Sequence, residues 1–264
     1  ATQSASGMTD SSLVFPKIGS AANTRTKPPS KTTQMAPVAP AEAPAVGVSL
    51  LDELRKQAEV RQRELHSAET ARTETAEAID QALQKLFAYL HDFVQQLNIL
   101  KPSIPRDYTL VEQVRLGLLT WHEGFADYRR QSQSDGALIE LVSLSFRLNG
   151  ERALTVERDG STTERFRALL FDIGLPFNCR EFKNTRHYVE RATFEIRSEL
   201  SVNARWRADF DKGLLILEMR NVERLGSMVI PVAPKLVDQT LLDEFGRLIL
   251  GQPSRFRELI RRPA

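Results

Sequence analysis

The stretch IDQALQKLFAYLHDFVQQLNIL, residues 79–100, decides how this chain folds. Its large apolar residues follow one another at alternating steps of four and three, which places them on one stripe of an α-helix. The stripe consists of Ile79, Leu83, Leu86, Leu90, Phe93, Leu97 and Leu100. This spacing is typical of a coiled-coil seam, so the segment predicts a helix whose stripe must be covered by another surface.

The same helix is expected to begin at Ser49, because the sequence SLLD at residues 49–52 resembles a capping box. No proline or glycine interrupts residues 49–100, and a helix of that length would measure about 78 Å. The first half of its stripe is weaker, since Arg61 and Arg72 occupy seam positions. We therefore expect the C-terminal half to pair firmly, and the N-terminal half to pair loosely or with a different partner.

Two arrangements would cover the stripe, and the sequence leaves both open. The helix can pair with a second chain, or it can fold back onto the sheet of its own domain. The prolines at 102 and 105 end the helix and would permit the fold-back. We favour self-association, because a strict heptad gives a narrow stripe, whereas packing on a sheet needs only a broader apolar face.

The chain is expected to have four parts. Residues 1–48 hold six of the 13 prolines among many Ala, Ser and Thr residues, which predicts a disordered tail. Met8 lies within it and is a candidate first residue of the natural chain, with residues 1–7 then an addition. Residues 49–100 form the long helix and residues 101–107 a proline-containing hinge. Residues 108–264 form a compact domain that is large enough to fold alone.

Period-two alternation is clearest in ATFEIRSELSVNARWRADF, residues 192–210, where only Ser198 breaks the apolar series. It predicts an antiparallel strand, or two strands with a bend, that has one wet face. DKG at 211–213 is a turn signal, and LLILEMR at 214–220 is the returning strand. Further strands are expected within 111–130, 137–148, 153–159 and 177–190.

Helices are expected over 163–171, after Pro234, and over 255–262. The order of these elements predicts an α+β fold. A disordered tail and a coiled-coil-like helix precede an antiparallel sheet that packs with two or three helices.

Composition narrows the classes of function. The formal net charge is only +2, which does not argue for nucleic acid, and no run approaches the roughly 18 apolar residues of a membrane span. The single cysteine, Cys179, rules out an intramolecular disulfide and a Cys/His zinc cluster. Phosphate-loop, dinucleotide-binding and nucleophile-elbow motifs are absent from the sequence. We expect a cytoplasmic protein without cofactor or metal, and we lean against an enzyme.

Two groups of residues are candidates for chemistry. In WHEGFADY, residues 121–128, no second histidine stands four residues from His122, so a zinc-protease arrangement fails on spacing. On a strand, Glu123 and Asp127 would share one face and His122 would lie on the other. Cys179 is followed by Arg180, a neighbour that would activate a thiol, but no companion base is identifiable. We interpret both groups as structural.

Arginine is the unusual feature of the C-terminal domain. Guanidinium groups suit carboxylate or phosphate recognition, yet acidic residues are interleaved with them, which favours ion pairs on a solvated face. The candidate partner-binding residues are Arg197, Arg205, Arg207, Arg220 and Arg224. An acidic protein is the first partner class that they suggest, and nucleic acid is a weaker second.

These features predict a non-enzymatic interaction or scaffold protein. It would self-associate, or bind another helical protein, through the long helix, and present an α+β binding domain. One alternative is a ligand-binding or enzymatic α+β domain with an apolar pocket under the helix that follows Pro234. A weaker alternative is a nucleic-acid binder that uses an arginine-rich sheet face.

Overall fold

The computed structural model of the protein describes residues 49–111 and 114–261. The predicted disordered tail, residues 1–48, and the candidate first residue Met8 lie outside the described residues. One compact unit extends from Glu53 to Ala264. The long helix and the sheet domain, which the sequence separated at residues 101–107, therefore belong to the same unit from Glu53 onward.

The long helix α1 spans Leu50–Leu100, as predicted, and its two halves differ in burial. Every residue from 49 to 74 is exposed, whereas the C-terminal half has a covered stripe. The buried residues of α1 are Ile79, Ala82, Leu83, Leu86, Leu90, Val94 and Leu97. None of the described helices has both the length and the hydropathy that crossing a bilayer requires.

The main sheet has six antiparallel strands in the order β1-β4-β5-β9-β10-β11. Its strands are β1 (Ser103–Ile104), β4 (Leu119–Arg130), β5 (Ile139–Asn149), β9 (Glu199–Asp209), β10 (Leu214–Arg220) and β11 (Ser227–Val232). The register pairs Trp206 of β9 with Leu217 of β10, and Leu217 with Ile230 of β11. The predicted return of the chain at 214–220 is thus confirmed.

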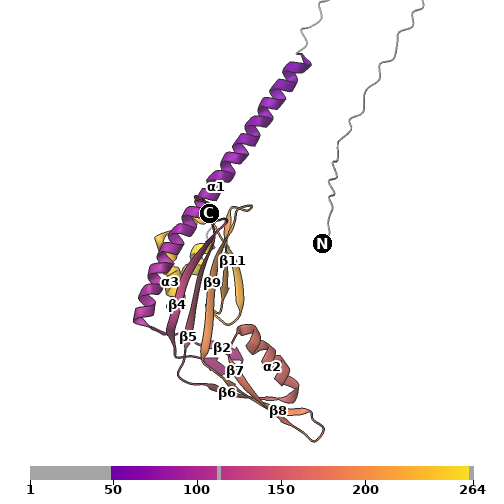
Figure 1. The fold of residues 1–264 in the computed structure, drawn as a ribbon, viewed down its shortest axis with the longest axis vertical. Helices are drawn as coiled ribbons and strands as arrows, with labels where there is room; N and C mark the ends of the chain where they lie inside the picture. Colours follow the sequence, from indigo (N-terminus) through magenta and orange to yellow (C-terminus); the bar gives the residue numbers. More distant parts are fainter. Residues whose placement is uncertain (1–48, 112–113, 262–264) are drawn as a thin grey trace, which may run out of the picture. The chain divides into compact units, whose positions relative to one another are not determined.

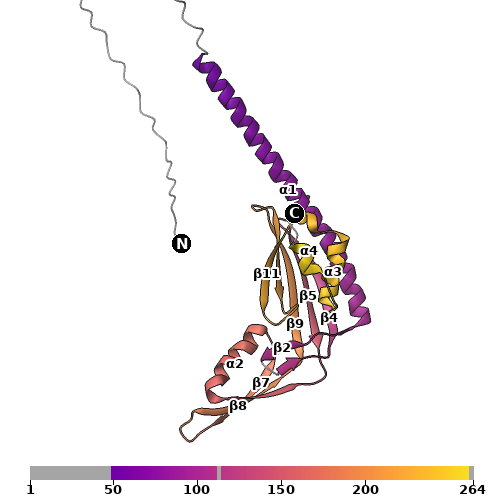
Figure 2. The same cartoon turned by 180° about the vertical axis from the view of Figure 1, so that it is seen from behind.

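One face of this sheet carries the core. The C-terminal half of α1, the helix α3 (Gln239–Ile249) and the short helix α4 (Phe256–Ile260) lie along it (Figures 1 and 2). Trp206 of the sheet meets Phe245 of α3 edge to face, with ring centroids 5.4 Å apart. Gly246 of α3 packs so closely on α1 that an added Cβ would lie 2.6 Å from the Tyr89 hydroxyl oxygen. Sheet and helices therefore share one continuous core.

A smaller three-stranded sheet holds the remaining helix, and a two-stranded hairpin precedes β4. The small sheet has the order β6-β8-β7, with β6 (Leu154–Asp159), β7 (Phe177–Lys183) and β8 (Val189–Ile196). Helix α2 (Gly160–Ile173) packs on it through Phe166, whose ring meets Phe194 edge to face at 4.9 Å. The hairpin consists of β2 (Tyr108–Val111) and β3 (Val114–Leu116). The α+β fold class is therefore confirmed.

The long alternation at 192–210 is two strands with a bend, one of the two predicted forms. Strand β8 ends at Ile196 in the small sheet and β9 begins at Glu199 in the large one. Ser198, the residue that broke the pattern, is buried in the bend and donates a hydrogen bond to the carbonyl of Arg152. The helix expected after Pro234 differs from the prediction, because a 3-10 turn, Pro234–Leu236, precedes α3.

Residues 101–107 fix α1 to the sheet. Ser103 and Ile104 form β1 and pair with the start of β4. The guanidinium of Arg106 donates hydrogen bonds to the carbonyl oxygens of Val222 and Leu248, the latter at 2.6 Å. The connection between helix and sheet is therefore held by contacts with distant parts of the chain.

The predicted seam is covered by the sheet of its own chain. Ile79, Leu83, Leu86, Leu90 and Leu97 are buried in the common core, Phe93 packs against that core, and Leu100 is 70% exposed at the helix end. In this structure the helix therefore folds back onto the sheet of its own domain, as the second predicted arrangement has it. This intramolecular packing takes the place of pairing between chains along the stripe. Self-association as such stays a prediction, and it has to use other residues.

Replacement of Leu83 and of Leu65 by alanine tests how the two halves of α1 differ. The two residues lie on the same side of the helix, but Leu83 is fully buried and Leu65 is 50% exposed. We expect Leu83→Ala to lower the free energy of unfolding by about 2–5 kcal/mol. Leu65→Ala should change it by less than about 0.5 kcal/mol when the chain is dilute enough to be monomeric. Urea denaturation measures both, and equal losses would contradict the described packing.

Candidate functional site: the open face of the sheet

The six-stranded sheet has a second face, opposite the core, which we call the open face. Residues that lie directly across from one another on paired strands share a face, so the register assigns its members. Three rows of opposed residues cross it: Asp127, Ser143, Arg205, Glu218 and Val229; Phe125, Ser145, Asn203, Arg220 and Ser227; and Glu123, Arg147 and Ser201. All of these side chains are exposed or half-buried. The predicted wet face is therefore a broad polar surface.

Ion pairs and hydrogen bonds engage part of this surface. Arg147 donates to the Glu123 carboxylate, and this hydrogen bond lowers the pKa of Glu123. Arg207, further along β9, lies 3.5 Å from the Glu218 carboxylate. These contacts agree with the expectation that acids interleave with arginines on a solvated face.

Two hydrogen-bond donors at the centre of the open face, the amide nitrogen of Asn203 and the guanidinium of Arg205, have no acceptor in the described part of the chain. Ser145 donates to the amide oxygen of Asn203 at 2.6 Å, and no described residue accepts from the Asn203 amide nitrogen. Within residues 49–111 and 114–261, the Arg205 guanidinium has neither an ion-pair partner nor a hydrogen-bond acceptor. Both residues lie on β9, between β5 and β10. An incoming acceptor would therefore meet free donors in the middle of the sheet.

Three adjoining hollows follow the open face. One of about 390 Å³ is lined by Phe125, Ser145 and Arg147, and a second of about 330 Å³ lies where Phe171 at the end of α2 approaches Arg147. A third, of about 230 Å³, is lined by Arg205. The first two share Arg147, and the first and third share Asn203. The hollows thus form a shallow, interrupted groove across several strands.

A larger cleft, of about 570 Å³, lies beside the β2–β3 hairpin and includes Asp107, Arg115 and Glu151. Residues 112–113, between β2 and β3 in the sequence, lie outside the described residues. The open face, in contrast, carries three of the predicted arginines, Arg205, Arg207 and Arg220.

The C-terminal end of α2 is fastened to the sheet beside the groove. Arg220 donates to the carbonyl of Asp172, and the buried Asn221 amide donates to the carbonyl oxygens of Ile173 at 3.0 Å and Ser201 at 2.9 Å. The Asn221 side-chain oxygen accepts from the amide of Gly226 at 2.9 Å. Arg220 therefore has a structural function in addition to lining the groove.

The free edge of β4 is closed by a side chain of α1. Asn98 donates to the carbonyl of Gly124 at 2.8 Å and accepts from the Gly124 amide at 2.8 Å, as a neighbouring strand would. Its oxygen also accepts from the Trp121 indole at 2.9 Å. Further along this edge, the Tyr128 amide donates to the Asp127 carboxylate. Because an edge must offer free backbone groups to pair with another strand, strand addition here is disfavoured.

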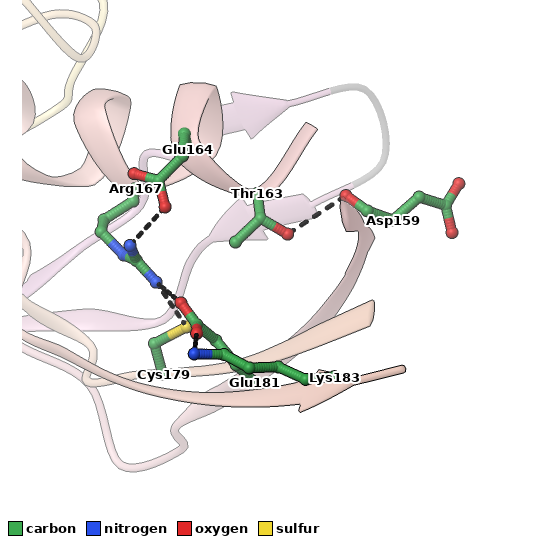
Figure 3. A network of polar contacts seen from close by, with 7 residues as sticks. All are labelled: Asp159, Thr163, Glu164, Arg167, Cys179, Glu181 and Lys183. Atoms are coloured by element: carbon green, nitrogen blue, oxygen red, sulfur yellow. Dashed lines mark hydrogen bonds and ion pairs between the residues drawn. The ribbon is translucent and has the colours of Figure 1, made fainter. Parts of the chain in front are cut away.

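Cys179 belongs to an ionic network between α2 and β7 (Figure 3). Arg167 of α2 approaches the Cys179 sulfur at 3.4 Å and donates to Glu181 at 2.6 Å, which lowers the pKa of Glu181. Lys183 lies 3.5 Å from the same carboxylate. Arg180, the neighbour that the sequence suggested, instead lies over the Phe182 ring at 5.2 Å. The network joins the helix to the strand, which supports the structural interpretation of Cys179.

The five predicted arginines are only partly together. Arg205, Arg207 and Arg220 lie on the open face, whereas Arg197 lies in the bend between β8 and β9, 4.0 Å from Glu199, and Arg224 lies in the β10–β11 loop. The sequence reasoning missed Arg147, Asn203 and Phe125 as members of the groove. The same period-two argument, applied to residues 137–148, would have placed Arg147 on the wet face.

Comparison with protein-family models, curated proteins and solved structures found no match. In the described ranges, no group of three or more His, Cys, Asp or Glu side chains could hold a metal ion. The function is therefore inferred from the open face alone.

Alanine replacement separates the structural arginine of the groove from the free one. Arg220→Ala removes the bond to the Asp172 carbonyl, so we expect it to lower the free energy of unfolding by about 1 kcal/mol. Arg205→Ala removes no bond within the described chain and should stay within about 0.5 kcal/mol of the wild type. Thermal and urea unfolding measure both variants, and a larger loss for Arg205→Ala would show that it has a structural function.

Proposed function

We propose that the protein is a non-enzymatic interaction protein whose open face binds an acidic segment of a partner protein. The observation that carries this proposal is Arg205, an exposed guanidinium at the centre of the sheet without an acidic partner in the described chain. A guanidinium group that is already paired within the chain stabilises the fold. One that has no partner and lies on a rigid strand can bind the carboxylate of another molecule.

The neighbouring ion pairs are suited to exchange with a partner. Arg147 and Arg207 are each about half exposed, with side-chain exposures of 53% and 52%. Exposed ion pairs contribute little to stability because solvent screens them, so replacing Glu123 or Glu218 by an incoming carboxylate costs little. Arg147 of β5 lies opposite Ser201 of β9, and Arg205 and Arg207 lie further along β9. A segment that runs along these two strands would therefore meet Arg147, Arg205 and Arg207 in turn.

Apolar side chains around the groove favour a protein over a nucleic acid. Phe125 is 63% exposed, Val229 65% and Phe171 69%, and each lines one of the three hollows. Protein interfaces combine such aromatic contacts with arginines.

The alternative of an apolar ligand pocket under α3 has less support. The rings of Trp206, Phe245 and Phe256 occupy the space beneath α3 and are fully buried. Glu244, also on α3, has its pKa lowered because it accepts a hydrogen bond from the backbone amide of Arg255 at 2.6 Å. This perturbed carboxyl therefore orders the turn into α4, which is a structural reason for its shift.

A fluorescent peptide rich in glutamate, with one tyrosine, serves as the probe, and single-stranded DNA of the same length is the comparison. We expect the full chain to bind the peptide better than the DNA in fluorescence anisotropy. Arg147→Glu/Arg205→Glu should weaken binding of the peptide about tenfold, equivalent to about 1.4 kcal/mol.

Arg186→Glu is a single charge reversal outside the groove, to be compared with Arg205→Glu alone. Arg186 is an exposed residue of the loop between β7 and β8 and lies on neither face of the large sheet. Arg186→Glu should change the affinity less than about twofold. Tighter binding of DNA, or an equal loss in Arg186→Glu and in Arg205→Glu, would contradict the proposal.

A further inference from the structure

The exposed half of α1 continues the stripe that the sheet covers in the other half. Eighteen residues make five turns of an α-helix, so Leu65 lies on the same line as Leu83. Leu65 is nevertheless 50% exposed, and Leu54, about three turns nearer the start of the helix on the same line, is 51% exposed. The residues that continue the stripe are Leu54, Ala58, Arg61, Leu65 and Ala68, which we call the free stripe.

We propose that the free stripe binds the free stripe of a second copy of the chain, with the two helices antiparallel. This inference concerns a different surface from the open face and does not depend on it. In the register that we propose, Leu54 of each copy packs against Leu65 of the other.

The spacing of the residues in the free stripe suits packing against the same stripe of a second, identical helix. Its members are spaced by steps of four and three, the spacing that lets two helices interlock along a narrow seam. The outer side of the helix is polar, with Arg63 3.8 Å from Glu59 on the next turn. A narrow apolar stripe between polar flanks is what a single partner helix covers, whereas a sheet or an apolar groove suits a broader face.

The sheet of the same chain decides the direction of the second helix. In a parallel pair, the second helix would run on beside residues 79–97, where the sheet already covers the stripe. In the antiparallel pair, α1 of the second copy begins at Leu50, which lies opposite Glu69 in the proposed register. The second helix therefore stops short of Ile79, and the antiparallel pair avoids the clash.

Charge favours the same direction. A parallel pair in register would place Arg61 beside Arg61 of the second copy, and Glu64 near Glu69 of the second copy, and like charges at these positions destabilise a coiled coil. The antiparallel register instead places Arg61 opposite Ala58. Arg61 then keeps its own ion pair with Glu64, at 3.2 Å. The two contacts between Leu54 and Leu65 form the apolar centre of the dimer.

A matched pair of variants of the full chain tests the surface. Leu65→Asp lies on the free stripe, and Val60→Asp, with a similar exposure of 53%, lies on another side of the same helix. We expect light scattering and sedimentation equilibrium to show a dimer of the wild type at high protein concentration. Val60→Asp should keep the dimer and Leu65→Asp should be monomeric with unchanged helix content.

Cysteine cross-linking tests the direction, in a Cys179→Ser background that removes the single native thiol. In the proposed register Leu51 lies opposite Ala68, so mixing Leu51→Cys and Ala68→Cys chains should give a disulfide-linked heterodimer under mild oxidation. Ala68→Cys alone should not cross-link, because the two copies of residue 68 lie far apart in the antiparallel pair.

Several outcomes would overturn the proposal. The proposal is wrong if the wild type stays monomeric at all protein concentrations. It is also wrong if Val60→Asp and Leu65→Asp disrupt the dimer equally. Efficient cross-linking of Ala68→Cys with itself would replace the antiparallel pair by a parallel one. Dimerisation that appears only after deletion of residues 1–48 would show that another segment of the chain covers the free stripe.

Discussion

The packing of one helical stripe, from Ile79 to Leu97, on the core face of the six-stranded sheet is the interaction on which the rest of the structure depends. Burial of a leucine side chain contributes about 1.5–3 kcal/mol, and Leu83, Leu86 and Leu90 are fully buried here. A sheet of this size needs a covering layer on at least one face. Helix α1 supplies that layer together with α3, and the opposite face stays polar.

The end of α1 is fixed to the sheet in several ways. Asn98 closes the edge of β4, Arg106 reaches the carbonyl groups of two distant segments, and the Tyr108 hydroxyl donates to the carbonyl of Val222 at 3.1 Å. These contacts hold the C-terminal half of the helix in one position on the sheet. The helix is longer than the surface that covers it, so its residues 50–74 stay exposed as a consequence of length. The two proposed binding surfaces, the open face and the free stripe, are what this arrangement leaves uncovered.

Local patterns predicted most of the elements. The period-two alternation placed β8, β9 and β10, and even its single fault, Ser198, marked the bend between two sheets. The helix was expected at 49–100 and lies at Leu50–Leu100. These features depend on interactions between neighbours in the sequence, which residue spacing reports directly.

Features that depend on distant contacts were harder to predict. Leu65 and Leu83 occupy equivalent positions on one stripe, yet only Leu83 meets the sheet, and nothing in the local spacing distinguishes them. Arg180 follows Cys179 in the sequence but lies on the other side of its strand, so Arg167 from α2 takes the contact instead. The groove was missed in part because Arg147 joins Arg205 only through the register of β5 and β9.

Native-state hydrogen exchange along α1 tests most directly that the C-terminal half of this helix belongs to the core and that its N-terminal half is exposed. In a chain dilute enough to be monomeric, we expect the amides of residues 83–97 to exchange only through global unfolding, because they lie in the core. The amides of residues 57–74 should exchange at least about a hundredfold faster, through local fraying of uncovered turns. Uniform protection along the whole of α1 in the monomer would contradict the account.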